Sequence, residues 1–296
     1  MATNPPEDLA DPKQKLRSLS RALDILELLG QGPAQGLAVG EVAAGIQVSR
    51  STAFVLLQTL VERGFVADVR LGGSRLYRLG LALVRLGIQV LAGDSLGQAA
   101  TPLLQQLTAS TNFTSRLAVL DDEGCAVAVA RVDAPGPFRL SSSLGRRELP
   151  HCSAVGKAIL SGLPEPEVRT LVQRLGMPRR TPRTLTTPAA LLNDLRLVRQ
   201  RGFAFDDEED NLGVVCVGAA LYDGSGQAVA AISVTGIKQD RSLASLVKLG
   251  RVVRAHADQI SQRLGGPTHQ EWCAAQPAGD AQRPRRHAPA TPRPGP

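Results

Sequence analysis

The chain has few cysteines, no apolar run of membrane-spanning length and no export signal at its start. The cysteines stand singly, at Cys125, Cys152, Cys216 and Cys273, and form no Cys-x-x-Cys pair. Residues 1–6 lack a cationic segment followed by an apolar one, so nothing signals export. A bilayer span needs about 18 apolar residues, and no run approaches that length. We expect a cytoplasmic protein with reduced thiols.

Signals for a metal or nucleotide cofactor are also missing. Gly156-Lys157 is not a phosphate-binding loop, because Ala158 replaces the Ser or Thr that such a loop requires. His151, Cys152 and Cys216 lack the spacing of a metal site, so we interpret them as core or solvated residues. We expect no metal and no cofactor.

One pentapeptide matches an enzyme motif. Gly93-Asp94-Ser95-Leu96-Gly97 fits the Gly-x-Ser-x-Gly nucleophile elbow, and Asp206 and His256 follow in the order of a triad. A serine esterase using Ser95 is therefore the alternative function. However, that elbow follows a strand, whereas Leu79 to Leu91 has helical spacing.

Length and charge point towards two domains and a polyanionic partner. The 296 residues suffice for a small domain and a larger one, and the net charge is +7. The segment from Pro12 to Leu91 contains ten Lys or Arg residues and five Asp or Glu residues. A basic tail alone could give the net charge, but this local excess falls in the region described next.

Residues Glu41 to Phe65 have the pattern of a helix-turn-helix. Apolar residues recur at helical spacing from Ala53 to Val61, Ser49 is a good N-cap, and Gly64 can end the helix in a left-handed conformation. A shorter apolar segment precedes it, and a first helix is expected after Ser18 or Ser20. An ordinary helical hairpin with a solvated polar face would show the same short pattern.

A basic hairpin after this helix favours DNA binding. Phe65 to Asp68 and Ser74 to Leu79 resemble strands, and Gly72-Gly73 supplies the positive φ of a tight turn. Together, the helix-turn-helix and the basic hairpin predict a winged helix that binds operator DNA. The expected DNA contacts are Ser49, Arg50, Ser51, Thr52, Phe54, Val55, Gln58, Arg70 and Arg75.

Leu79 to Leu91 is expected to be an apolar linker helix. Its stripe of Leu81, Val84, Ile88 and Leu91 suggests burial against a partner chain, and a dimer would present two recognition helices to two half-sites. Packing against the chain's own second domain is the alternative.

The remainder predicts an α+β domain with an antiparallel sheet. Helices are expected at Leu96–Ala109, Ala154–Leu160, Glu165–Leu175, Ala189–Gln200 and Leu243–Leu264, and strands at Arg116–Leu120, Ala126–Val132, Phe138–Leu140, Val214–Tyr222 and Gln227–Val234. We expect a disordered lead (1–15), a winged-helix domain (16–80), the linker helix (81–95), the α+β domain (96–265) and a disordered Pro/Arg-rich tail (266–296).

Several short motifs occur once each along the chain, in a characteristic order. They are Ser20-Arg21-Ala22-Leu23-Asp24-Ile25-Leu26, Ser51-Thr52 with Leu56-Leu57-x-x-Leu60, Arg78-Leu79-Gly80, His151-x-Ser153-Ala154-x-Gly156-Lys157-Ala158, Gly202-Phe203-Ala204-Phe205-Asp206-Asp207-Glu208-Glu209, Gly213, Cys216 and Ala231-Ile232-Ser233-Val234-Thr235-Gly236. Over residues 16–265 their order and spacing resemble the IclR family of bacterial transcriptional regulators.

The resemblance implies a winged helix joined to a GAF-like effector-binding domain, a dimer or dimer of dimers, and an organic or aromatic acid as effector. The implied effector-binding residues are Ala154, Val155, Asp206, Val214, Cys216, Ser233 and Thr235. On residue type alone, Cys216 would be a small buried hydrophobe and Asp206 part of a solvated acidic turn.

Two positions depart from the family pattern. Val55 stands where an arginine is usual, and Gly218-Ala219-Ala220 stands where Ala-Ala-Pro is usual. Operator affinity is then expected to rest more on Arg50 and the wing. We expect an effector-controlled transcriptional regulator, with repression and activation both open, and no enzyme.

Overall fold

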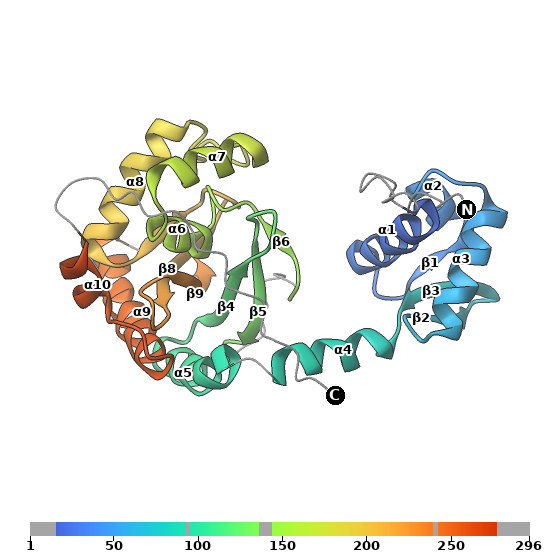
Figure 1. Ribbon diagram of the computed structural model, residues 1–296, viewed down its shortest axis with the longest axis horizontal. Coiled ribbons are helices and arrows are strands. Elements are labelled where there is room, and N and C mark those ends of the chain that lie inside the picture. The colour runs from blue at the N-terminus through green and yellow to red at the C-terminus, as the bar shows by residue number, and fades with distance from the viewer. Residues whose placement is uncertain (1–15, 93–94, 136–143, 239–241, 277–296) are drawn as a thin grey trace, which may run out of the picture. The chain divides into compact units, whose positions relative to one another are not determined.

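The computed structural model describes residues 16–92, 95–135, 144–238 and 242–276 (Figure 1). The chain divides into two compact units, Met1–Asp94 and Ser95–Pro296. Both combine helices with antiparallel strands, which confirms the predicted α+β class. Within the described ranges, no helix is both long and apolar enough to cross a membrane.

The first unit is a three-helix core with a small sheet. In chain order its elements are α1 (Arg17–Gln31), β1 (Leu37–Ala38), α2 (Val39–Gly45), α3 (Arg50–Glu62), β2 (Val66–Leu71), β3 (Ser74–Leu79) and α4 (Leu81–Ala92). The sheet order is β1-β3-β2. Ile25, Val42, Leu57 and Tyr77 bring three helices and the hairpin into one buried cluster.

Local sequence signals set the ends of α3 and of the hairpin. Ser49 caps α3 by accepting a hydrogen bond from the Thr52 N–H, and Gly64 after the helix has φ +73°. Gly72 and Gly73 form the hairpin turn with φ of +57° and +81°. Two glycines adopt such conformations in succession at little cost. The three helices followed by this hairpin confirm the predicted winged helix.

The predicted first helix is α1, and only part of its apolar face is buried. Ile25 and Leu29 are buried, but Leu19 and Leu23 are 56% and 53% exposed. The apolar stripe is wider than the surface that α2 and α3 cover, so its outer edge faces solvent in this chain.

The second unit contains a six-stranded antiparallel sheet of order β6-β5-β4-β9-β8-β7. Its strands are β4 (Thr114–Leu120), β5 (Ala126–Val132), β6 (Arg147–Glu148), β7 (Ala204–Asp207), β8 (Val214–Tyr222) and β9 (Ala228–Ile237). Its helices are α5 (Ser95–Thr111), α6 (Ala154–Ser161), α7 (Glu165–Leu175), α8 (Pro188–Arg201), α9 (Leu243–Arg263) and α10 (His269–Ala275).

The two faces of this sheet differ in what covers them (Figure 1). Leu117, Val217 and Ile232 pack with α5 and α9 into the main core. Side chains alternate along a strand, so Ala118 and Ala231 point the other way, into a second cluster under α6. We call this second surface the α6 face.

The second unit differs from the sequence predictions in two of its strands and at the start of the C-terminal tail. The predicted strand Phe138–Leu140 lies outside the described residues. Strands β6 and β7 were not predicted. The predicted tail from residue 266 is wrong at its start, because α10 is ordered by Trp272, which stacks on Tyr222 at 4.9 Å and donates a hydrogen bond to the Gly226 carbonyl.

Candidate functional site

Three hydroxyl side chains cluster at the N-terminus of α3. The Ser49 hydroxyl accepts from the Thr52 N–H at 3.1 Å and lies 2.9 Å from the Ser51 hydroxyl and 2.8 Å from that of Thr52. All three remain at the surface of the unit. The first turn of a helix carries free N–H groups and a positive dipole end, so this cluster can receive a phosphate or a base edge.

The rest of the outer face of α3 is partly apolar. Phe54 is 42% exposed and Val55 63% exposed. Gln58 is half-buried, and its amide nitrogen has no hydrogen-bond partner in the described part of the chain. Arg50 is exposed and its guanidinium lies over Gly40, where a Cβ would come within 2.8 Å of Nη2.

The wing carries one exposed and one anchored arginine among the predicted contacts. Arg70 is exposed on β2. Arg75 forms an ion pair of 2.8 Å with Asp68, and its guanidinium lies 5.4 Å from the Tyr77 ring and 6.0 Å from the Phe54 ring. Arg75 thus brings the wing and α3 into contact.

In the second unit, polar side chains gather at one end of the α6 face. Strand register places Arg116 opposite Ser233, Ser233 opposite Gly218, Thr235 opposite Cys216, and Cys216 opposite Asp206. The charged and polar members, Arg116, Asp206, Cys216, Ser233 and Thr235, are each at most 5% exposed. The buried residues on the rest of this sheet face are mostly alanine, packed against Val155 and Ile159 of α6 and Val198 of α8.

The N-terminus of α6 lies over this polar end. A Cβ on Gly218 would be 2.9 Å from the Ala154 carbonyl carbon and 3.1 Å from the Val155 nitrogen, so glycine allows the helix to approach the strand closely. Ser153 caps the helix by accepting from the Gly156 N–H at 3.2 Å. Helix geometry gives the Ala154 and Val155 N–H groups no intrahelical acceptor, which suits an anionic or carbonyl ligand.

The structure therefore brings most of the predicted effector residues together. Within the cluster the Thr235 hydroxyl donates to the Cys216 sulfur at 3.3 Å. Val214 shares the face of Cys216 but is only half-buried, at the start of β8. Asp206 is not a solvated turn residue, because it lies on β7 and is 4% exposed.

Burial shifts the pKa values of the acidic members of this cluster upwards. It raises the pKa of Asp206 to about 6, although the N–H groups of Glu209 and Asp210 and the charge of Lys157 act in the opposite direction. It also raises the pKa of Cys216 well above its usual value, so this thiol is neutral. The polar cluster thus holds a carboxyl group that can change charge near neutral pH.

Arg116 was not among the predicted site residues. Burial lowers its pKa, but Glu148 at 2.6 Å outweighs this effect, and the net pKa is raised. Its only sequence signal is a charged residue directly before the apolar run Leu117–Leu120. Its partner Glu148 is on β6, more than thirty positions away, and no local pattern indicates that pairing.

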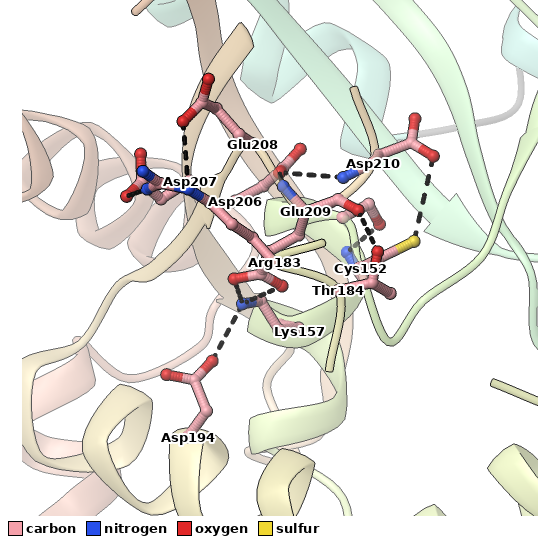
Figure 2. A network of polar contacts seen from close by, with 12 residues as sticks. Cys152, Lys157, Arg183, Thr184, Asp194, Asp206, Asp207, Glu208, Glu209 and Asp210 are labelled. Atoms are coloured by element: carbon pink, nitrogen blue, oxygen red, sulfur yellow. Dashed lines mark hydrogen bonds and ion pairs between the residues drawn. The ribbon is translucent and has the colours of Figure 1, made fainter. Parts of the chain in front are cut away.

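A second network of buried polar contacts joins α6 to the acidic turn after β7 (Figure 2). The Lys157 ammonium on α6 contacts Glu209 at 2.6 Å and Asp194 at 3.0 Å. Two more hydrogen bonds stabilise the acidic turn after β7. The Asp206 carboxylate accepts one from the Glu209 N–H at 2.8 Å, and the Glu209 carbonyl accepts one from the Thr184 hydroxyl at 2.7 Å. This network fixes α6 and Asp206 relative to each other.

The esterase alternative has no support in the structure. Ser95 is exposed at the first turn of α5, and the described element before it is the helix α4 rather than a strand. A nucleophile elbow requires a strand, a sharp turn and then a helix.

Comparison with known proteins gives matches over both units. The IclR helix-turn-helix domain matches residues 18–70, and the bacterial transcriptional regulator IclR C-terminal domain matches residues 88–262. The chain is 33% identical over 257 residues to the acetate operon repressor of Salmonella typhimurium, covering 85% of this chain and 91% of that protein.

Two further proteins are similar over most of their length. The HTH-type transcriptional regulator BhcR of Paracoccus denitrificans is 32% identical over 252 residues, which are 85% of this chain and 88% of that protein. The crystal structure of Thermotoga maritima IclR superimposes with a TM-score of 0.68 at 29% identity, covering 85% of this chain and all of that one.

Proposed function

The chain belongs to the IclR family of bacterial transcriptional regulators, and we propose that a small organic acid, bound on the α6 face, controls its binding to operator DNA. It is a DNA-binding regulator of the IclR type, and its relatives are regulators rather than enzymes. The observation that carries the effector proposal is the group of buried polar side chains at the N-terminus of α6, on a sheet face that is otherwise apolar.

For the DNA side, we propose that α3 enters the major groove and the wing follows the backbone. Ser49, Ser51 and Thr52 offer hydroxyls at the helix N-terminus, and Arg50 and Arg70 offer exposed charge. Phe54, Val55 and Gln58 complete the outer face of α3, while Arg75 positions the wing against it.

For the effector side, the acid hydrogen-bonds the free N–H groups of Ala154 and Val155 and the hydroxyls of Ser233 and Thr235. Cys216 and Val214 add apolar contact, and Asp206 closes the far side on β7. Hydroxyl and amide groups in a buried site fix the orientation of a small acid, because any group left unpaired costs free energy.

We propose that the protein acts in the cytoplasm as a homodimer or a dimer of dimers. Helix α4 exposes Leu81, Val84 and Leu86 at 82%, 55% and 43%. Exposed neighbouring apolar side chains of this kind favour burial against a second copy. Leu19 and Leu23 on α1 are further exposed leucines of the same unit.

The functional boundaries follow from these assignments. We propose residues 16–80 as the DNA-binding domain, 81–95 as the linker and 96–276 as the effector domain. The last boundary is extended from 265, because α10 packs on Tyr222 through Trp272 and on the Arg199 carbonyl through His269.

Fluorescence anisotropy with labelled DNA tests this proposal. DNA from upstream of the protein's own gene and its neighbours, and then a pool of genomic fragments, is offered at two salt concentrations with random DNA as competitor. We expect one sequence to bind more tightly than the competitor at the higher salt, because base contacts survive screening better than phosphate contacts. Equal binding of every fragment and the competitor would contradict a sequence-specific regulator.

A further inference from the structure

Arg116 has an unfilled hydrogen-bonding edge. Its side chain is 5% exposed, and Nη1 donates to Glu148 at 2.6 Å. Its Nε is buried and has no partner among the residues that the structure describes. A guanidinium binds a carboxylate best along the edge that includes Nε, and a buried donor without a partner is costly. The edge best suited to an anion is the one left open.

The neighbouring arginine on the same face shows the contrast. Arg131 lies directly opposite Arg116 on β5, and its Nε donates to Asp133 at 2.5 Å. The chain thus supplies an internal carboxylate to the Nε edge of Arg131. Glu148 uses a different nitrogen of Arg116 and leaves the corresponding edge open.

A second unpartnered group lies beside Arg116. Ser233 is fully buried, and its hydroxyl has no hydrogen-bond partner within the described ranges. Ser233 is the direct register partner of Arg116 on β9. Opposed residues in an antiparallel pair have Cα atoms about 4.5–5.5 Å apart, so both groups can reach one ligand. An N–H donor and a hydroxyl converge there.

We propose that Arg116 and Ser233 together bind the carboxylate of the effector, with Glu148 orienting the guanidinium. This inference rests on the proposed effector site and specifies its anionic end. Two buried donors side by side require an acceptor with more than one lone-pair site, which a carboxylate supplies. A neutral amide of the same shape has one acceptor oxygen and would bring two further N–H donors against the guanidinium.

The position of Arg116 also implies a second polar group on the effector. Arg116 is on β4, and the Ala154 and Val155 N–H groups lie over Gly218, two strands away on β8. Neighbouring strands are about 4.8 Å apart, so these N–H groups and the guanidinium approach the ligand from opposite ends. The effector class is therefore a small acid that carries a second oxygen, such as a keto, hydroxyl or second carboxyl group.

Calorimetric titration of the full-length protein with paired probes tests the inference. The acids are pyruvate, succinate and 4-hydroxybenzoate at millimolar concentrations, and each is matched with its uncharged amide. We expect at least one acid to bind and its amide to bind at least about tenfold more weakly, since a charge-assisted hydrogen bond is replaced. Equal binding of acid and amide, or no binding by any of the acids, would overturn the assignment.

A double variant isolates the role of Arg116. Arg116→Gln with Glu148→Gln removes both charges, so that neither is left buried alone, and circular dichroism verifies the fold. We expect the acid to bind at least about tenfold more weakly to this variant. The matched control is Arg147→Gln, which removes an arginine next to Glu148 on β6 that pairs with Asp121 and Glu123 at the surface.

The outcomes separate this inference from the proposed function. If an acid binds the double variant as tightly as the wild type but does not bind Thr235→Val, Arg116 is not a ligand of the acid. The proposed effector pocket would then still stand. If Arg147→Gln weakens binding as much as the double variant does, the loss comes from a disturbed β6. Arg116 would then no longer be assigned as a ligand of the carboxylate.

Discussion

The Lys157 ammonium lies 2.6 Å from a carboxylate oxygen of Glu209, and the Lys157 side chain is 1% exposed. Burial lowers the pKa of Lys157, but Glu209 and Asp194 outweigh this effect and raise it, so the group stays charged. The pair joins α6 to the acidic turn that follows Asp206 (Figure 2). Both proposed walls of the effector pocket therefore depend on one buried ion pair.

Lys157→Met is expected to destabilise the protein strongly. It leaves Glu209 and Asp194 without their shared cation, and removing one member of a buried pair costs about 3–5 kcal/mol. Urea denaturation at neutral pH measures the loss. The control is Arg169→Ala, which breaks an exposed pair with Glu165 on α7 and is expected to cost less than about 1 kcal/mol. Similar losses in both variants would show that Lys157 does not stabilise the core.

Asp206→Asn is expected to stabilise the protein at high pH. Burial raises the pKa of Asp206 to about 6, so the carboxyl favours the folded state while protonated and loses that advantage as pH rises through 6. Asparagine can keep the acceptor for the Glu209 N–H. The gain in free energy of unfolding is expected to be about 2–3 kcal/mol at about pH 8 and about half of that at about pH 5.

Urea denaturation of wild type and Asp206→Asn at the two pH values measures this difference. A variant that gains no stability at the higher pH would show that Asp206 is not held as a costly buried anion.

Arg50→Ala is expected to weaken operator binding by about 1–3 kcal/mol if Arg50 contacts a base. Arg50 is at the N-terminus of α3, where a recognition helix meets base edges. The control is Arg63→Ala, which removes the same charge from the other end of this helix. Competition anisotropy at matched salt measures both. Equal losses, or no loss, would exclude a specific contact by Arg50.

If α4 forms the proposed dimer interface, Val84→Asp is expected to make the protein monomeric. Val84 is 55% exposed in the single chain, and a charge buried in an apolar interface is strongly unfavourable. Sedimentation velocity measures the mass. Leu197→Asp, at a 52% exposed leucine on α8, is the control and should leave the mass unchanged. A Val84→Asp protein that remained dimeric would place the interface elsewhere.

The sequence predicts best those elements whose signals are local. Ser49, Gly64 and the Gly72-Gly73 pair act within a few residues of their own positions, so α3 and the wing can be predicted. The proposed effector-binding residues were predicted from the family resemblance. Alternation along β9 places Ser233 and Thr235 on one face, but residue type alone would have left Asp206 in a solvated turn.

What the sequence could not predict depends on distant partners. Strand β7 exists because Asp206 pairs with Cys216, and no apolar alternation marks it. Arg116 is buried because Glu148 neutralises it from another strand. Helix α10 is held on the domain because Trp272 stacks on Tyr222. In each case the favourable contact joins residues far apart in the chain, and the short pattern around either one does not reveal it.

The central claim is that an acid on the α6 face changes the affinity of α3 for the operator. The most direct test is anisotropy of one labelled operator fragment with wild-type protein and with the Thr235→Val variant, each titrated with the acid that binds in calorimetry. We expect the acid to change operator affinity in the wild type at least about fivefold and to have little effect on the variant. An operator affinity that is the same with and without saturating acid would contradict the claim.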